Sequence, residues 1–166
     1  MGPSLRKWGK LSALLFVVIL VASACSKSDD NSSGSGLTTP TATIFVQNFQ
    51  YHDVPASITS GIHEFLFQNK ESFTITHEMI PIALPSGKTA QDVINGAKAN
   101  GPSDEDSWLH IGGDFGAVDT GAGIVEILNL PPGNYAFACW QTGTQSGGEN
   151  GPPHASLGMV AQFTVT

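Results

Sequence analysis

Residues 133–166 of the chain read GNYAFACWQTGTQSGGENGPPHASLGMVAQFTVT, and this stretch decides the fold. Tyr135, Phe137 and Cys139 alternate with other residues, which places their side chains on one face of a β-strand. A segment rich in Gly and Pro follows. A second set then alternates in the same way: Met159, Ala161, Phe163 and Val165. The stretch therefore predicts two strands joined by a long loop.

Three residues that can bind a soft metal lie where these predicted strands meet the loop. Cys139 ends the first strand, His154 lies in the loop, and Met159 begins the second strand. Thiolate, imidazole and thioether are the donors that copper favours in proteins. The stretch is thus a candidate copper site at one end of a β-structure.

The N-terminus resembles a bacterial lipoprotein signal. Arg6, Lys7 and Lys10 precede an apolar run over residues 11–21 that is too short to cross a bilayer. The small residues Ala-Ser-Ala then stand directly before Cys25. The resemblance implies that residues 1–24 are a signal peptide and that Cys25 carries lipid. An uncleaved anchor and a plain secretory signal are the alternatives, and all three place the remaining chain outside the cytoplasm.

The expected location outside the cytoplasm decides how the cysteines of the chain are interpreted. The chain has two cysteines, so lipid on Cys25 leaves Cys139 without an intrachain partner for a disulfide. An unpaired thiol in an exported protein is expected to pair with another molecule, to react, or to bind something. A buried cysteine acting as a small apolar side chain is the alternative. His154 and Met159 downstream favour metal binding.

Charge and composition bound the domain organisation and the partners. Beyond residue 25, the chain has four basic residues and fourteen acidic ones, and such an acidic domain without a basic cluster is a poor nucleic-acid binder. The acidic charge does not favour binding to anionic lipid, so attachment to a bacterial membrane is expected to come from the N-terminus, through lipid on Cys25. Residues 25–41 are polar and are expected to form a flexible linker, whereas residues 42–166 suffice for one domain.

That domain is expected to be all-β. Its candidate strands cover residues 44–51 (with a bulge near 47–48), 54–59, 62–69, 73–84, 124–130 and the closing pair. About seven strands are typical of a Greek-key β-sandwich.

One short helix is expected to interrupt the strands. Ala90, Val93, Ile94 and Ala97 have the spacing of one apolar helix face. Thr89 with Asp92 resembles a capping box, and residues 100–102 (Asn-Gly-Pro) predict the end of the helix.

A copper site with one thiolate needs two histidines, and four candidates remain for the second. His77 is the best, because it lies inside the predicted strand 73–84 and follows a turn-like segment. His52 and His63 flank turns and are expected at the surface. His110 falls in an irregular acidic segment.

The pattern of residues 133–139, His154, residues 158–160 and a final Phe-Thr-Val strand resembles the cupredoxins, or blue copper proteins. Residues 67–69 with His77 are similar to the strand that brings the first histidine in that family. The resemblance covers roughly residues 62–80 and 126–166. It implies that His77, Cys139 and His154 form a trigonal plane around one copper ion, with Met159 as a weak axial ligand.

The resemblance also implies a function: an extracytoplasmic carrier of single electrons. Such a protein is not an enzyme, needs a redox partner protein and takes no small-molecule substrate. Two alternatives stay open, namely a copper carrier or cupredoxin-like binding module without a redox role, and an enzyme in which Cys139 is the nucleophile.

The chain departs from the family in one respect. Fourteen residues separate Cys139 from His154, whereas familiar cupredoxins have only a few there. Four glycines loosen this loop, and Pro152 and Pro153 stiffen it next to His154. We expect the proline pair to restore the positioning of His154. A site more exposed or more distorted than a typical blue copper centre is the alternative.

Overall fold

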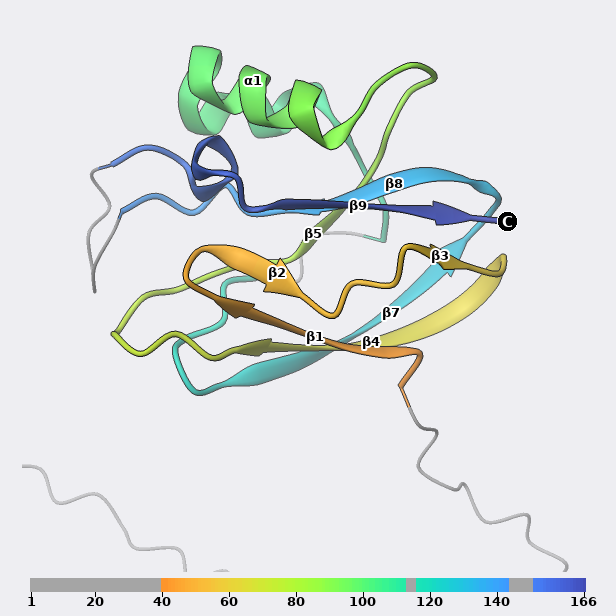
Figure 1. The fold of residues 1–166 in the computed structure, drawn as a ribbon, viewed down its shortest axis with the longest axis horizontal. Coiled ribbons are helices and arrows are strands. Elements are labelled where there is room, and N and C mark those ends of the chain that lie inside the picture. Colours follow the sequence, from red (N-terminus) through yellow and green to blue (C-terminus); the bar gives the residue numbers. More distant parts are fainter. Residues whose placement is uncertain (1–39, 113–115, 144–150) are drawn as a thin grey trace, which may run out of the picture. The chain divides into compact units, whose positions relative to one another are not determined.

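Two β-sheets face each other across a core of large apolar side chains (Figure 1). The computed structural model describes residues 40–112, 116–143 and 151–166. Sheet A has the order β2 (Gln50–His52), β1 (Ala42–Gln47), β4 (Gly61–Asn69) and β7 (Gly123–Leu130). Sheet B has the order β3 (Ser57–Ile58), β9 (Val160–Val165), β8 (Gly133–Ala138), β5 (Ile80–Ala83) and β6 (Leu109–His110). The predicted β-sandwich with one short helix is confirmed.

Sheet A follows the alternation of its sequence. Along β4, Phe65 and Phe67 are fully buried between half-exposed neighbours, and along β7 Leu128 and Leu130 are buried in the same way. One face of this sheet lies on the core and the other meets solvent, which is why the period of two is clear.

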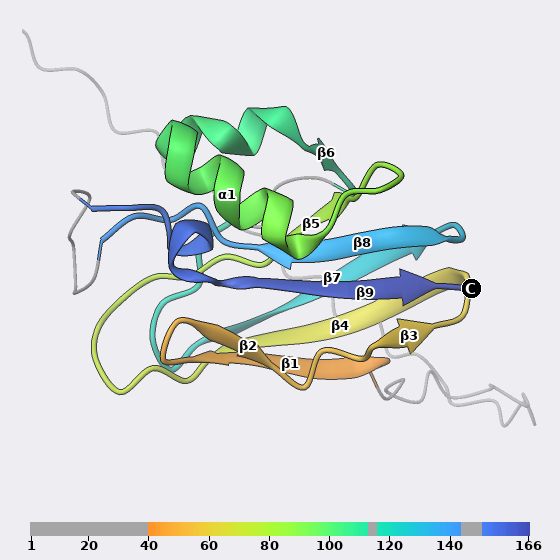
Figure 2. The same cartoon turned by 45° about the horizontal axis from the view of Figure 1, so that its top comes forward.

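Strand β8 is buried on both faces. Tyr135 and Phe137 belong to the core between the sheets, whereas Ala136 and Ala138 belong to a second apolar cluster with the helix α1 (Ala90–Asn100). Figure 2 shows α1 lying over the outer side of sheet B. The alternation of large and small residues in β8 thus reflects a thick core on one side and a closely packed helix on the other.

Helix α1 begins and ends where the sequence predicts. The backbone N–H of Thr89 donates to Asp92 Oδ2 at 2.9 Å, and the buried face consists of Val93 and Ala97. The helix ends at Asn100, and Gly101 adopts the left-handed φ of 68° that favours glycine. The chain then continues as a 3₁₀ helix, η1 (Gly101–Ser107).

Three strand predictions were wrong in detail. Residues 73–79 are not part of a strand, because β5 begins only at Ile80. The expected bulge near residues 47–48 is a hairpin turn that separates β1 from β2. Of residues 54–59, only Ser57–Ile58 form a strand. The described residues contain six strands of four or more residues and three shorter ones, compared with the seven expected.

The predicted signal peptide (residues 1–24), the lipid-bearing Cys25 and nearly all of the linker (25–41) lie outside the described residues and stay predictions. In the part of the chain that the structure describes, no helix is both long enough and apolar enough to cross a membrane.

Candidate metal centre

His77 reaches the site from an irregular segment between the two sheets. Its backbone exchanges two hydrogen bonds with Val118, an isolated bridge rather than a strand. Asn69, at the end of β4, fixes this segment because its side-chain amide donates to the carbonyls of Ile75 (2.8 Å) and Val118 (2.9 Å). The expectation that a strand holds His77 was therefore wrong, although the side chain arrives beside Cys139 as expected.

Cys139 follows directly after β8, and its Sγ points into the sandwich. Its carbonyl accepts the backbone N–H of Ala155, and its Sγ accepts the backbone N–H of Glu78 at 3.4 Å. The residue after His77 thus provides a hydrogen bond to the sulfur. Such contacts around the thiolate tune a copper–thiolate site.

Contacts at the base of its loop position His154. Its backbone N–H donates to Gln141 O at 2.9 Å, and Thr142 forms an isolated bridge with Pro153. His154 then begins the short 3₁₀ helix η2 (His154–Leu157), which leads to β9. Pro153 is part of a closed base that the sequence did not predict, and the expected stiffening by the proline pair stays a prediction.

The three donor atoms form a compact triangle. His77 Nδ1 and His154 Nδ1 are 3.0 Å apart, and Cys139 Sγ lies 3.3 Å from His154 Nδ1 and 3.9 Å from His77 Nδ1. A point inside this triangle is about 2 Å from all three atoms, close to the length of metal–imidazole and metal–thiolate bonds. Among the described residues, no other group of three His, Cys, Asp or Glu residues has this geometry.

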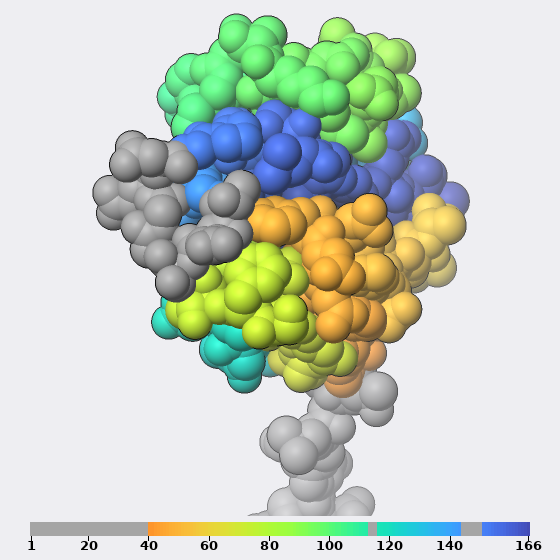
Figure 3. Space-filling model, turned by 60° about the vertical axis from the view of Figure 1, so that its left-hand side comes forward, coloured from red at the N-terminus to blue at the C-terminus, as the bar shows by residue number. Residues whose placement is uncertain are grey.

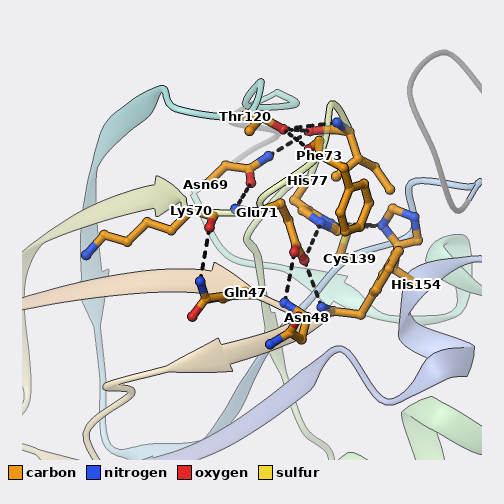
Figure 4. A network of polar contacts seen from close by, with 12 residues as sticks. Gln47, Asn48, Asn69, Lys70, Glu71, Phe73, His77, Thr120, Cys139 and His154 are labelled. Atoms are coloured by element: carbon orange, nitrogen blue, oxygen red, sulfur yellow. Dashed lines mark hydrogen bonds and ion pairs between the residues drawn. The ribbon is translucent and has the colours of Figure 1, made fainter.

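Each imidazole turns its other nitrogen toward an oxygen. His154 Nε2 donates to Gly143 O at 2.7 Å, and His77 Nε2 faces Glu71 Oε1 at 3.3 Å. The second contact is long and lacks ideal hydrogen-bond geometry, but Nε2 has no other partner among the described residues. Figure 4 shows Glu71, His77, Cys139 and His154 together. A proton on each Nε2 leaves both Nδ1 lone pairs directed at the centre of the triangle, as metal-binding histidines require.

Burial sets the protonation of the three residues. It lowers the pKa of His77 to about 4, helped by the neighbouring His154 and opposed by Glu71. Burial also lowers the pKa of His154, against the hydrogen bond to Gly143. Burial raises the pKa of the Cys139 thiol well above its usual value, and the carboxyl of Glu78 adds to this effect. Both imidazoles are thus neutral at pH 7, and two facing lone pairs beside a sulfur suit a bound cation.

The fourth expected ligand, Met159, immediately precedes β9. Its side chain is fully buried in the same core cluster as Cys139, and its backbone N–H donates to His154 O at 3.1 Å. The backbone of Met159 therefore adjoins His154, one of the three residues of the triangle.

The other three histidines lie away from this cluster. His52 stacks on Phe45, and His110 stacks on Trp140. His63 is buried and contacts Thr59 O through Nε2 at 2.7 Å, so the expectation of a surface position was wrong for it.

Two residues at the site were missed by sequence reasoning. Glu71 falls in a segment interpreted as a turn, and Phe49 was assigned to a continuous first strand. Glu71 contacts His77, and the Phe49 ring packs edge-on against both imidazoles. Neither residue has a spacing relative to Cys139 that indicates a role.

No protein-family model and no curated protein matches the sequence. Among solved structures, the chain resembles reduced auracyanin from the photosynthetic bacterium Roseiflexus castenholzii, with 20% identity over 75% of this chain and 94% of that one, at a TM-score of 0.51. Auracyanin B is similar at 19% identity, 77% and 91% coverage and a TM-score of 0.48. An azurin from Methylomonas sp. strain J is similar at 14% identity, 75% and 95% coverage and a TM-score of 0.44.

These similar structures are cupredoxins. The likeness to the Roseiflexus auracyanin shows that the chain has the cupredoxin fold. The family resemblance drawn from the sequence is confirmed at the level of the fold.

Proposed function

We propose that this protein binds one copper ion and carries single electrons. One observation supports the proposal above all: two neutral imidazole nitrogens and a cysteine sulfur converge to within 3.0–3.9 Å of one another in a cupredoxin fold. His77, Cys139 and His154 would hold the ion, with Met159 as the weak axial ligand. Two histidines and one cysteine in a trigonal arrangement are the ligands of blue copper electron-transfer sites.

The surroundings of the ligands suit electron transfer. Copper supplies a one-electron couple when bound. His77, Cys139, His154 and Met159 are each 0% exposed, so water and substrates have no direct access to them. Hydrogen bonds to Gly143 and to Sγ of Cys139 keep the donors in place without the metal. A fixed ligand set keeps the reorganisation small when the oxidation state changes.

The same observations weigh against the other candidate functions. A cysteine nucleophile needs a lowered thiol pKa, whereas burial raises the pKa of Cys139. A carrier that exchanges copper benefits from accessible ligands, whereas these ligands are buried. We therefore favour the electron carrier over an enzyme and over a copper carrier without a redox role.

The proposal extends to location and partners. The lipoprotein-like N-terminus supports attachment of the mature protein to a bacterial membrane through Cys25, on the extracytoplasmic side. Electrons would then pass to and from a redox partner protein in the same compartment.

The test is metal binding by residues 26–166, which contain every described element. Addition of Cu(II) is expected to yield one bound ion per chain and an intense thiolate-to-copper absorption band. Cys139→Ala is expected to abolish the band, because the thiolate is lost. A reversible one-electron wave in voltammetry distinguishes an electron carrier from a protein that only transports copper. A folded protein that binds no copper would contradict the proposal.

A further inference from the structure

The turn between β1 and β2 has an unusual residue at its second position. Asn48 and Phe49 have φ angles of 53° and 57°, and the paired residues Gln47 and Gln50 make this a two-residue hairpin turn. Such a turn needs positive φ at both central positions and therefore favours Asn followed by Gly. A bulky aromatic residue in this conformation is strained, and the strain needs an explanation from its surroundings.

Glu71 stabilises the strained turn. Its two oxygens accept the backbone N–H groups of Asn48 at 2.9 Å and Phe49 at 2.8 Å. The oxygen that accepts from Phe49 also faces His77 Nε2 at 3.3 Å. Two backbone N–H groups thus donate to the carboxylate of Glu71, and Nε2 of His77 can donate to it when this nitrogen carries the proton. Figure 4 shows the Glu71 carboxylate between Asn48 and His77.

Glu71 is itself fixed in the interior. Its side chain is fully buried, and its backbone N–H donates to Asn69 Oδ1 at 3.1 Å. The same Asn69 fixes the segment that carries His77. Because Asn69 is the last residue of β4, this hydrogen bond fixes the position of Glu71 relative to sheet A.

The turn places an aromatic ring over the metal-binding residues. The Phe49 ring meets the His154 ring at a centroid distance of 4.9 Å and the His77 ring at 5.4 Å, edge-on in both cases. Phe49 is half-buried, whereas both imidazoles are completely buried, so the ring lies between them and the solvent. Figure 3 shows the β1–β2 region (orange), the segment after β4 (yellow-green) and the last segment of the chain (blue) meeting on one face.

We propose that Glu71 is a positioning residue of the metal centre: it joins the Nε2 atom of His77 to the turn that holds Phe49 over both imidazoles. The inference rests on the proposed copper function. A carboxylate behind a histidine ligand fixes its tautomer and raises its basicity, which favours Cu(II) over Cu(I). The Phe49 ring excludes water and small anions from the ion.

Two variants test these two contributions. Glu71→Gln removes the charge and places an amide N–H₂ against donor groups, whereas Phe49→Gly removes the ring and relieves the backbone strain. We expect Glu71→Gln to weaken Cu(II) binding by about 10- to 100-fold and to raise the reduction potential. When azide is added, the thiolate-to-copper absorption band is expected to shift in both variants and to stay unchanged in the wild type.

Matched controls are Glu126→Gln, a buried carboxyl without a hydrogen-bond partner among the described residues, and Phe45→Ala, a half-buried aromatic residue that stacks on His52. Both are expected to retain wild-type copper affinity, potential and resistance to azide. Circular dichroism and thermal unfolding confirm that each variant is folded. Folded Glu71→Gln and Phe49→Gly proteins with wild-type affinity, potential and azide resistance would overturn the proposal.

A measurement on the metal-free protein separates this inference from the copper function. The ¹⁵N shifts of the His77 ring are expected to report one tautomer, protonated at Nε2, in the wild type and a mixture in Glu71→Gln. If the wild type binds no copper, the proposed function fails, while the tautomer still reports on Glu71. If the wild type binds copper and the tautomer is unchanged in Glu71→Gln, the role assigned to Glu71 is wrong.

Discussion

Two glutamates in the interior of the sandwich, Glu78 and Glu126, have very different surroundings. The Glu78 carboxyl accepts the backbone N–H of Trp140 at 2.8 Å and the side-chain amide of Gln141 at 2.9 Å. Glu126 is 1% exposed on the core-facing side of β7, and neither of its oxygens has a hydrogen-bond partner among the described residues. Burial raises the pKa of Glu126 to about 8, so this carboxyl is neutral at pH 7.

Glu126 is expected to make the stability of the metal-free protein depend on pH. The folded protein keeps this proton up to about pH 8, whereas the unfolded chain releases it near its ordinary value of 4.5. Between these values the folded state binds more protons, so the contribution of Glu126 to the free energy of unfolding falls as pH rises. Glu126→Leu is expected to be more stable than the wild type by about 1–3 kcal/mol at pH 8, with a smaller difference at pH 4.5.

Urea unfolding at a series of pH values measures this difference. Glu126→Gln is the control, because its neutral amide removes the titration without adding an apolar side chain. If the free energies of unfolding of the wild type and of Glu126→Leu differed by the same amount at every pH between 4.5 and 8, Glu126 would not titrate as the structure indicates.

The sequence indicated the donor residues that the fold brings together, and it did not indicate the residues around them. Cys139, His154 and Met159 are recognisable because donor types of the right chemistry lie at the ends of two alternating segments. Glu71 and Phe49 acquire their positions only through tertiary contacts across 22 positions of the chain. No local pattern distinguishes Glu71 from any other turn glutamate, and Phe49 in a left-handed conformation opposes its local preference.

At the level of elements, strands were predicted correctly where one face of the strand lies on the core. The prediction was wrong where side chains, and not a neighbouring strand, form hydrogen bonds with the backbone. Residues 61–69 and 123–130 alternate and form β4 and β7. Residues 73–79 also alternate, but their backbone groups bond elsewhere. The Thr120 hydroxyl contacts the carbonyls of Phe73 and Ile75 and accepts the N–H of Ile75. The alternation of residues 73–79 does not indicate that a side chain on a distant loop forms hydrogen bonds with their backbone.

Helix α1 packs on η1 through a glycine. A Cβ atom at Gly96 would approach the carboxyl carbon of Asp104 to 2.8 Å, closer than real side chains allow. Asp104 cannot easily move, because it is 3% exposed and accepts hydrogen bonds from Trp108 Nε1 (3.0 Å) and the Asn100 side chain (3.2 Å). Gly96 is therefore required by a close contact inside an otherwise regular helix.

Gly96→Ala is expected to lower the free energy of unfolding by about 1–3 kcal/mol, because the added methyl displaces Asp104 from its partners. The intrinsic preference of helices acts in the opposite direction and favours Ala by about 1 kcal/mol. Chemical denaturation measures the sum. Ala99→Gly, at an exposed position of the same helix, is the control and should show only the helix preference. A stabilised Gly96→Ala protein would mean that Asp104 moves freely.

On the scale of the whole molecule, the long segment between Cys139 and His154 is closed at its base. Thr142 pairs with Pro153, and a Cβ atom on Gly151 would lie 3.0 Å from the backbone of Gly143. The two chain segments therefore meet before residue 144. From the sequence, the length and the glycines of this loop were expected to loosen His154, and Pro152 and Pro153 were expected to restore its position. Loop length alone shows nothing about contacts between the ends of the loop.

Shortening the loop is therefore expected to leave the site unchanged. We expect a variant with Asn-Gly in place of residues 144–150 to bind copper with the same stoichiometry and absorption spectrum, since a two-residue turn suits two paired segments. Gly151→Val keeps the length but places a side chain against Gly143, whose carbonyl accepts from His154 Nε2. We expect this second variant to alter the spectrum. The opposite result would show that residues 144–150 position His154.

The donor residues also belong to different layers. His77 is tied to the side of β4 and β7 through Asn69 and Val118, whereas Cys139 and His154 flank β8 and β9. An ion bound by all three would cross-link the two layers, much as a disulfide does, in a domain whose described cysteine is free. Binding of the ion would close two rings of chain, one between His77 and Cys139 and one between Cys139 and His154. It should therefore slow unfolding while leaving the folded structure nearly unchanged. The metal centre would then also hold the two layers of the sandwich together.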